Sequence, residues 1–293
     1  MGVLIDCKVV ADQILTEARN EVEEIIKNTG GVPRLAVIIV GDDPASQVYV
    51  RNKVRRCEAV GIESDVFRLD KNISQTYINL LIRGLNNEPD IHGILVQMPL
   101  PKHLDEDAII NAIHPDKDVD GLHPQNQARL LNNIEPRLDP CTPAGVMRIL
   151  SHVHPEGIEG KHAVVIGRSR LFGKPMAQLL QNANATVTVC HSKTESIEYH
   201  MWGANIVISA IGSPHKFNTC HFVRDTTIID VGINRLEDGK IVGDVDTDLI
   251  LHGMPDSNIQ ITPVPGGVGI LTTAMLMLNT IKAYKIQKES DGQ

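Results

Sequence analysis

The chain has 293 residues, of which 42% are hydrophobic and 22% charged, and its net charge at pH 7 is −8. This length suits about two domains, the composition is that of an ordinary globular protein, and the acidic balance argues against general binding to nucleic acid or an anionic membrane. The five cysteines are scattered without a CxxC pair, which argues against a disulfide framework or a zinc site and favours a reducing compartment.

The first part of the sequence alternates between helical and strand patterns. Apolar residues at helical spacing predict a helix over 8–28, and the apolar run RLAVIIVG predicts a buried strand over 34–41. Asp43 and Pro44 form a typical N-cap and first helical residue, so a second helix begins there. The pattern then predicts a strand over 63–69, a helix over 74–87, a strand over 93–100 and a helix over 105–113. This alternation favours a parallel sheet covered on both faces.

A segment rich in Pro, Asp and Asn, residues 114–142, interrupts the alternation and is interpreted as a connection between domains. Thr142 and Pro143 are expected to cap the next helix. The alternation then resumes, and it predicts a strand over 162–167, a helix over 173–183, strands over 186–190, 205–211, 226–231 and 241–245, and a final helix over 269–287. The fold class predicted from the pattern is therefore α/β with parallel strands.

The stretch VVIGRSRLFGKP, residues 164–175, lies where a strand passes into a helix. Gly167 allows a tight turn and Gly173 allows close backbone approach at the helix start, where N–H groups suit a phosphate. Arg168 and Ser169 replace the middle glycine of GxGxxG, so a plain strand–turn–helix connection stays open as an alternative.

The next strand ends in CHSKT, which contains Ser192 and Lys193 but no carboxylate. NAD-preferring Rossmann domains place an acidic residue there on the ribose 2′-hydroxyl. A 2′-phosphate would instead suit this position, with Arg168 as a bidentate donor. The sequence therefore favours NADP over NAD.

A basic cluster occupies the helix that begins near Pro44. Helical spacing places Ser46, Tyr49, Lys53 and Arg56 on one face. A lysine crowded by other cations binds its proton less tightly and can act as a general base. The alternative is a solvated, purely structural helix face.

Three other stretches are candidates for ligand contact. Gln97 falls at the carboxyl end of a buried strand, where functional side chains gather in open α/β sheets, although it is also compatible with an edge residue in solvent. Asp120 in KDVDG is either a simple turn residue or an anchor for a ring rich in donors. The run TPVPGGVG, residues 262–269, combines stiff prolines with glycines that admit close approach, so it indicates a ligand-facing loop.

Eight ordered motifs make the sequence resemble the bifunctional methylenetetrahydrofolate dehydrogenase/methenyltetrahydrofolate cyclohydrolase (FolD-type) family. They are YVRNK, GILVQMPLP, KDVDG, PCTPAG, GRSRLFGKP, VCHSKT, DVGIN and TPVPGGVG, and the resemblance spans about residues 5–285. It implies an N-terminal folate and catalytic domain over 1–120, joined by a returning C-terminal helix over 270–287. It also implies an NADP-binding Rossmann-type domain over 141–269, with a cleft between the domains.

The resemblance also implies the site residues. Lys53 resembles the catalytic lysine of the cyclohydrolase step, Tyr49 the aromatic residue that stacks on the folate, Gln97 the partner of the lysine, and Asp120 the carboxylate that holds the pterin. The implied catalytic set is Lys53, Tyr49, Gln97 and Asp120. The implied substrate-binding set is Tyr49, Val96, Gln97, Met98, Asp120, Pro265, Gly266, Gly267 and Val268. The implied cofactor-binding set is Gly167, Arg168, Ser169, Gly173, Ser192 and Ile233.

The expected function is oxidation of 5,10-methylenetetrahydrofolate with NADP, followed by hydrolysis of the methenyl product, within one-carbon metabolism and purine biosynthesis. The expected partners are tetrahydrofolate derivatives and a second copy in a homodimer, with no metal, nucleic acid or membrane. Because no secretory signal or apolar run of membrane-spanning length is present, a cytoplasmic location is expected. A dehydrogenase without cyclohydrolase activity and a non-catalytic NADP-binding module are the alternatives.

Three positions depart from the family pattern. Cys7 replaces a glycine in the opening DGK motif, Ala128 replaces a glycine in NQARL, and Ile270-Leu271 replaces Pro-Met after the TPVPGGVG run. None is a residue assigned to catalysis, but the last is expected to alter the packing of the folate loop.

Overall fold

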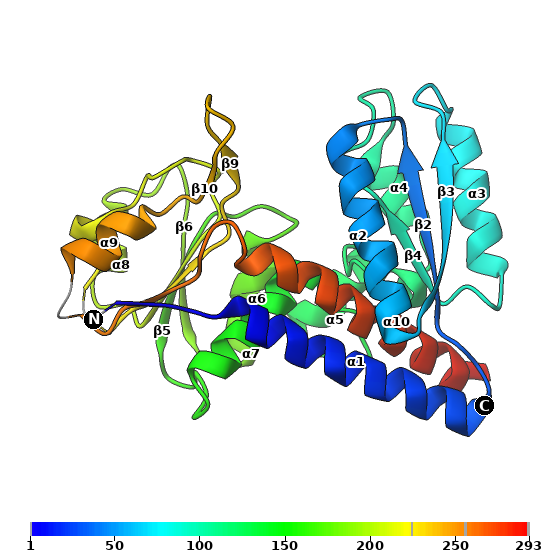
Figure 1. The fold of residues 1–293 in the computed structure, drawn as a ribbon, viewed down its shortest axis with the longest axis horizontal. Helices are drawn as coiled ribbons and strands as arrows, with labels where there is room; N and C mark the ends of the chain where they lie inside the picture. The colour runs from blue at the N-terminus through cyan, green and yellow to red at the C-terminus, as the bar shows by residue number, and fades with distance from the viewer. Residues whose placement is uncertain (1, 224, 255–256, 292–293) are drawn as a thin grey trace. The chain divides into compact units, whose positions relative to one another are not determined.

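The computed structural model describes residues 2–223, 225–254 and 257–291. The chain forms two compact units, each containing its own sheet (Figure 1). Unit 1 comprises residues 1–12 and 142–272, and unit 2 comprises residues 13–141 and 273–293. Among the described residues, no helix is both long and apolar enough to cross a membrane.

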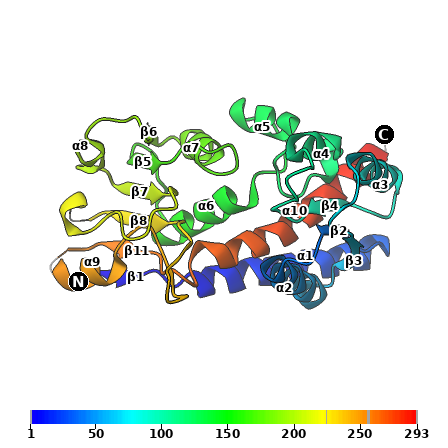
Figure 2. The same cartoon turned by 90° about the horizontal axis from the view of Figure 1, so that it is seen from above.

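Unit 2 is built on a three-stranded parallel sheet in the order β3-β2-β4. Its strands are β2 (Arg34–Val40), β3 (Glu63–Leu69) and β4 (Gly93–Val96). Helix α2 (Pro44–Val60) covers one face, and α3 (Gln75–Asn87) and α4 (Glu106–Ala112) cover the other (Figures 1 and 2). The predicted start of α2 is confirmed, because the Asp43 carboxylate accepts the Ser46 N–H at 2.7 Å and Pro44 opens the helix.

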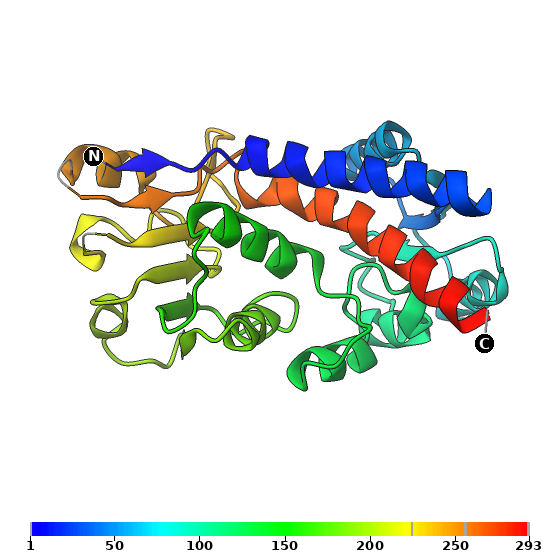
Figure 3. The same cartoon turned by 90° about the horizontal axis from the view of Figure 1, so that it is seen from below.

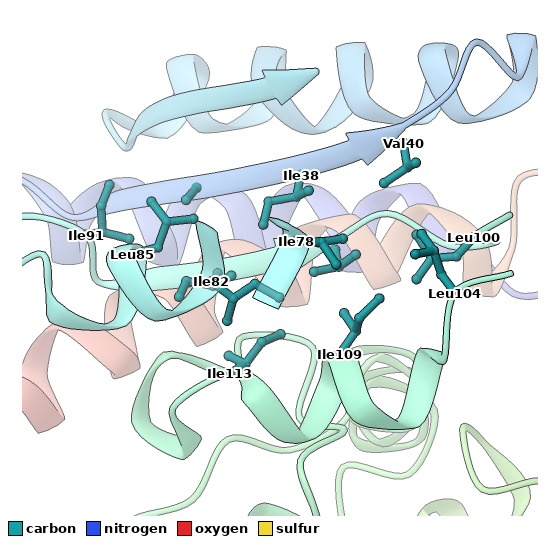
Figure 4. Packing of buried hydrophobic residues seen from close by; sticks show 13 residues of the cluster. Ile38, Val40, Ile78, Ile82, Leu85, Ile91, Leu100, Leu104, Ile109 and Ile113 are labelled. Atoms are coloured by element: carbon teal, nitrogen blue, oxygen red, sulfur yellow. The ribbon is translucent and has the colours of Figure 1, made fainter. Parts of the chain in front are cut away.

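The core of unit 2 follows from the period of two in its strands. Alternate residues of β2 point to the α3–α4 side, where they meet apolar side chains of both helices (Figure 4). Ile38, Ile78, Ile82 and Ile109 are fully buried there. The intervening residues of β2 are buried on the opposite face, which is why this strand reads as a continuous apolar run.

Two long helices of the chain pair within unit 2, namely the part of α1 (Cys7–Thr29) from residue 13 and the part of α10 (Val268–Asp291) from residue 273. They run side by side (Figure 3). Lys285 forms an ion pair of 2.7 Å with Glu21, and the hydroxyls of Thr29 and Tyr284 lie 3.0 Å apart.

Unit 1 contains a six-stranded parallel sheet in the order β6-β5-β7-β8-β11-β1 (Figure 2). The strands are β1 (Val3–Leu4), β5 (His162–Ile166), β6 (Thr186–Cys190), β7 (Ile206–Ser209), β8 (Thr227–Asp230) and β11 (Gln260–Ile261). A separate antiparallel pair is formed by β9 (Asn234–Arg235) and β10 (Ile241–Val242). The helical segments are α6 (Cys141–Val153), α7 (Gly173–Asn182), α8 (Ile197–Met201), η2 (Thr219–His221) and α9 (Thr247–Gly253).

The predicted α/β fold class with parallel strands is confirmed, but several limits differ. The strand expected over 93–100 ends at Val96, since the prolines that follow cannot donate to a strand ladder. The connection over 114–142 contains η1 (Pro115–Lys117) and α5 (Pro124–Leu131). Helix α6 begins at Cys141, so Thr142 and Pro143 lie in its first turn and do not precede it as caps.

The short strands β1 and β11 were not predicted. Each has only two residues, and the pairing of Val3 with Gln260 joins segments from opposite ends of the chain. A two-residue strand has no periodicity to read, so only its long-range partner defines it.

Candidate functional site

A lysine and a glutamine meet in unit 2. The Lys53 Nζ donates a hydrogen bond of 3.0 Å to the Gln97 Oε1, and the Gln97 Nε2 donates one of 2.6 Å to the Met98 carbonyl. Gln97 lies directly after β4 and is 9% exposed, whereas Lys53 is half-buried on α2. Because both ends of its amide are engaged, Gln97 holds the lysine head in a defined position.

The Asp120 carboxylate lies near this pair. Burial raises the pKa of Asp120 to about 6, the charge of Lys53 opposes that rise, and the neighbouring Asp118 carboxylate adds to it. The structure therefore groups Lys53, Gln97 and Asp120, three of the four residues expected to be catalytic, in one unit. The charge of Lys53 favours the ionised form of the Asp120 carboxylate and so limits the rise of its pKa.

The turn that carries Asp120 is held by Asp118, which the sequence analysis did not single out. Asp118 is 1% exposed and pairs alongside Ile94 of β4 in an isolated bridge. Its carboxylate accepts the His123 N–H at 2.8 Å and the Asn126 side-chain amide at 2.9 Å. Burial raises the pKa of Asp118, and these donors oppose the rise. The DxD spacing in KDVDG was the available signal for this second carboxylate.

Exposure varies along the predicted face of α2. Ser46 is buried, Lys53 and Arg56 are half-buried, and Tyr49 is 53% exposed. An exposed aromatic ring one turn before a half-buried lysine is available to stack on a flat ligand.

The glycine-containing loop of unit 1 follows β5 closely. Gly167 has a φ of +121°, and a Cβ there would lie 2.6 Å from the Ala210 carbonyl oxygen. A Cβ at Gly173 would collide with the Gly167 carbonyl oxygen. Both positions require glycine, so backbone can approach a phosphate closely here, which fits a dinucleotide.

Not all N–H groups at the start of α7 are free. The Ser169 Oγ accepts the N–H groups of Phe172 and Gly173 at 3.2 and 3.3 Å, and the Ser169 carbonyl accepts that of Lys174. The N–H groups of Phe172, Gly173 and Lys174, expected to suit a phosphate, are therefore already engaged by Ser169. Arg168, Ser169 and Ser192 are exposed, and Ile233 is 62% exposed.

The tip after β6 is ordered by its own side chains. The Thr194 Oγ1 accepts the His191 N–H at 2.9 Å, and the His191 Nδ1 accepts the Lys193 N–H at 3.1 Å. The tip presents Ser192 and Lys193 without a carboxylate, as the sequence analysis noted.

The loop of residues 262–269 lies in unit 1 and leads into α10. Gly266 has a φ of +93°, and a Cβ at Gly267 would collide with the Pro263 carbonyl oxygen. Pro265 and Gly266 are exposed, whereas Val268 is buried. In unit 2, the remaining predicted substrate-binding residues Val96 and Met98 flank Gln97, with Val96 5% exposed.

The three departures from the family pattern lie in different surroundings. Cys7 is 1% exposed, Ala128 is exposed on α5, and Leu271 is fully buried in α10. The expected effect of Ile270-Leu271 on the loop before them stays a prediction. Within the described ranges, no group of three or more His, Cys, Asp or Glu side chains is placed to hold a metal ion.

Comparison with known proteins places this geometry in context. The sequence model described as the tetrahydrofolate dehydrogenase/cyclohydrolase catalytic domain matches residues 5–120, and the one described as the NAD(P)-binding domain of the same proteins matches residues 140–288. The bifunctional protein FolD of Brevibacillus brevis is 46% identical over 284 residues, covering 97% of this chain and 98% of the relative. That of Dechloromonas aromatica is 49% identical over 281 residues, covering 96% of each.

Solved structures agree with the sequence matches. The bifunctional FolD enzyme from Campylobacter jejuni is 44% identical, with a TM-score of 0.91 and coverage of 98% of this chain and 99% of that one. The methylenetetrahydrofolate dehydrogenase-cyclohydrolase from Trypanosoma brucei, solved with NADP cofactor and an inhibitor, is 36% identical. Its TM-score is 0.88, and the coverage is 97% and 98%.

Proposed function

Because the chain belongs to the tetrahydrofolate dehydrogenase/cyclohydrolase family, we propose that it oxidises 5,10-methylenetetrahydrofolate with NADP⁺ and then hydrolyses the methenyl product to 10-formyltetrahydrofolate. The observation that carries this proposal is the contact of Lys53 with Gln97 beside the Asp120 carboxylate. A non-catalytic NADP-binding module has no need of this grouping in unit 2.

The dehydrogenase step depends on positioning. NADP⁺ would supply the hydride acceptor for the methylene carbon, an oxidation that converts the methylene folate to the methenyl cation. In unit 1, Gly167 and Gly173 admit the cofactor phosphates to the backbone, and Arg168, Ser169 and Ser192 bind phosphate oxygens. The Ser169 oxygen already accepts two N–H groups, so its hydroxyl hydrogen is available to donate. Ile233, which is 62% exposed, would supply an apolar contact to the cofactor.

The cyclohydrolase step adds water to the methenyl carbon and releases one proton. The Lys53 amine uses one hydrogen bond to contact Gln97. Its other hydrogen-bonding positions can hold the attacking water, and the amine can take part in the proton transfer. Asp120, as a carboxylate, accepts the amino and ring N–H donors of the pterin. Tyr49 stacks on the aminobenzoyl ring. The loop of residues 265–268 is assigned to folate binding as well.

We further propose a cytoplasmic homodimer that serves one-carbon metabolism, including purine biosynthesis. The scattered cysteines, four of which are buried and unpaired, support a reducing compartment. The resemblance in sequence supports the dimer, and sedimentation of the purified protein would test it.

The direct test of the function is to mix purified protein with 5,10-methylenetetrahydrofolate and either NADP⁺ or NAD⁺. Reduced cofactor, methenyl and formyl products are followed separately. We expect all three with NADP⁺. If no reduced nicotinamide forms with either cofactor, the proposal is wrong, and if methenyl product accumulates without catalysed hydrolysis, the protein is a monofunctional dehydrogenase.

Substitution of the lysine tests its role. Lys53→Met removes the head group that contacts Gln97, so we expect hydrolysis of methenyltetrahydrofolate to fall by at least about 100-fold, the scale of a lost acid–base group. NADP⁺ binding, which depends on unit 1, stays as in the wild type. The control is Lys27→Met, which removes an exposed lysine in the last turn of α1. Unchanged hydrolysis in Lys53→Met would refute the assignment.

A further inference from the structure

Two buried carboxylates, Asp230 and Asp244, lie at the carboxyl end of the sheet in unit 1. Asp230 ends β8, and Asp244 follows β10. Their exposed fractions are 1% and 0%. Burying a carboxylate is costly unless it is fully hydrogen-bonded, so the donors around each one show what the pair holds in place.

Asp244 accepts hydrogen bonds from two separate segments. Its Oδ2 accepts the Ser209 hydroxyl at 2.9 Å and the Ile211 N–H at 2.8 Å. Its Oδ1 accepts the Ser213 N–H at 2.8 Å and the Asn234 side-chain amide at 3.0 Å. One side chain therefore joins the loop after β7 to the segment that begins β9.

Asp230 is hydrogen-bonded to the backbone on both sides of the β9–β10 pair, including the N–H of Asp244 itself. Its carboxylate accepts the N–H groups of Gly232, Asp244 and Val245 at 2.9, 3.1 and 2.8 Å. A Cβ at Gly232 would collide with the Asp244 side chain, and one at Gly243 would collide with that of Asp230. The two carboxylates thus fix the ends of the short segment that presents the exposed Ile233.

The loop held by Asp244 lies at the switch point of the sheet. β5 has β6 on one side and β7 on the other, so the chain reverses its direction of winding there, and ligands of open α/β sheets bind outside the carboxyl ends of the strands at that point. The Ala210 carbonyl in the loop after β7 packs against Gly167 in the loop after β5. A displacement of residues 210–213 would therefore reach the phosphate loop.

We propose that Asp244, braced by Asp230, is a positioning residue for NADP⁺ that holds the loop over 210–213 and the Ile233 segment in the shape that receives the cofactor. The inference rests on the proposed function for the identity of the cofactor. Asp244 acts through these backbone segments and does not itself contact the reacting atoms.

Asp244→Asn is the sharpest substitution, because it keeps the shape and removes one acceptor. In either orientation the new amide NH₂ faces a backbone N–H, that of Ile211 or that of Ser213, and one partly buried donor loses its partner. We expect the dissociation constant for NADP⁺, measured by calorimetry, to rise about tenfold, since a donor that loses its partner away from bulk water has an effect of that size. Hydrolysis of methenyltetrahydrofolate without nicotinamide, for which the proposed proton-transfer residue Lys53 lies in unit 2, should stay within about twofold of wild type, a limit that a tenfold effect clearly exceeds.

The control is Asp238→Asn, the same change at an exposed residue whose carboxylate accepts the Lys240 N–H at 2.8 Å. It should leave both measurements unchanged. If Asp244→Asn binds NADP⁺ as tightly as wild type, the proposal is wrong. If Asp244→Asn fails to fold, Ser209→Ala, which removes one donor to Asp244, decides the question, and an unchanged NADP⁺ affinity in that variant overturns the proposal. Failure of the wild-type protein to bind NADP⁺ would instead contradict the proposed function.

Discussion

Asp120 is subject to two opposing effects, burial that disfavours its charge and a nearby lysine that favours it. The net result is a pKa of about 6, above the ordinary value of 3.8. Between these two values the folded protein holds a proton that the unfolded chain has released. Stability from this group is therefore greatest below pH 3.8, decreases as the pH rises toward about 6, and is constant above that.

Asp120→Asn tests this balance because asparagine does not titrate. The difference in free energy of unfolding between the variant and wild type should shift in favour of the variant as the pH rises from about 4 to about 6, and then stay level. Urea denaturation across this range measures it. Asp230, whose pKa burial also raises to about 6, is present in both proteins and cancels. A difference that is the same at all pH values would contradict the environment described for Asp120.

At the scale of single residues, the sequence identified candidate site residues, but it did not predict which of them contact each other. Lys53 and Gln97 were both singled out, but the direct contact between them joins residues 44 positions apart. Asp118 and Asp244 were missed, because a carboxylate that accepts backbone N–H, amide or hydroxyl donors looks in the sequence like any other acidic residue. Their hydrogen bonds depend on loops that the fold brings together.

At the scale of elements, the helix α3 offers a direct test of the core in unit 2. Ile82 is fully buried against the sheet, whereas Leu80 on the same helix is 61% exposed. Ile82→Ala should lower the free energy of unfolding by about 2–5 kcal/mol, through lost apolar burial and a residual cavity. Leu80→Ala should change it by less than about 0.5 kcal/mol. Urea unfolding gives both values, and equal losses in the two variants would show that the helix face is assigned wrongly.

Helices and strands that carry their own signals were predicted well. The N-cap Asp43 and Pro44 located the start of α2, and strands β2 and β3 match their predicted runs closely. Errors occur where a longer-range partner sets the limits. β4 ends at Val96, and β9 and β10 form a pair of two-residue strands in place of one longer strand.

At the scale of the whole molecule, the last helix stabilises the turn of unit 2 that carries Asp120. Asn279 on α10 is 5% exposed, and its side-chain amide donates to the carbonyls of Val119 and Asp139 at 2.8 Å each. The first of these carbonyls directly precedes Asp120. The residue after Asp120 is Gly121, and its φ of +69° favours glycine at this position of the turn.

Asn279→Ala should therefore lower the free energy of unfolding by about 1–3 kcal/mol, because two buried carbonyls lose a donor. It should also weaken folate binding if Asp120 holds the pterin as proposed. The matched control is Asn20→Ala on the exposed side of α1, where alanine is the better helix former and no loss is expected. Thermal or urea unfolding together with a folate titration would check both expectations, and wild-type stability in Asn279→Ala would argue against this link.

Local patterns were sufficient for the α/β class, for most helices and strands, and for the family, because amphipathic periods, caps and glycine-rich turns act over a few neighbouring residues. Packing was needed for the rest. The joining of β1 to β11, the contact of Lys53 with Gln97, and the carboxylates of Asp118 and Asp244 all bring together residues that are separated along the chain. Hydrogen bonds and desolvation at such places depend on distances in space, which no period in the sequence encodes.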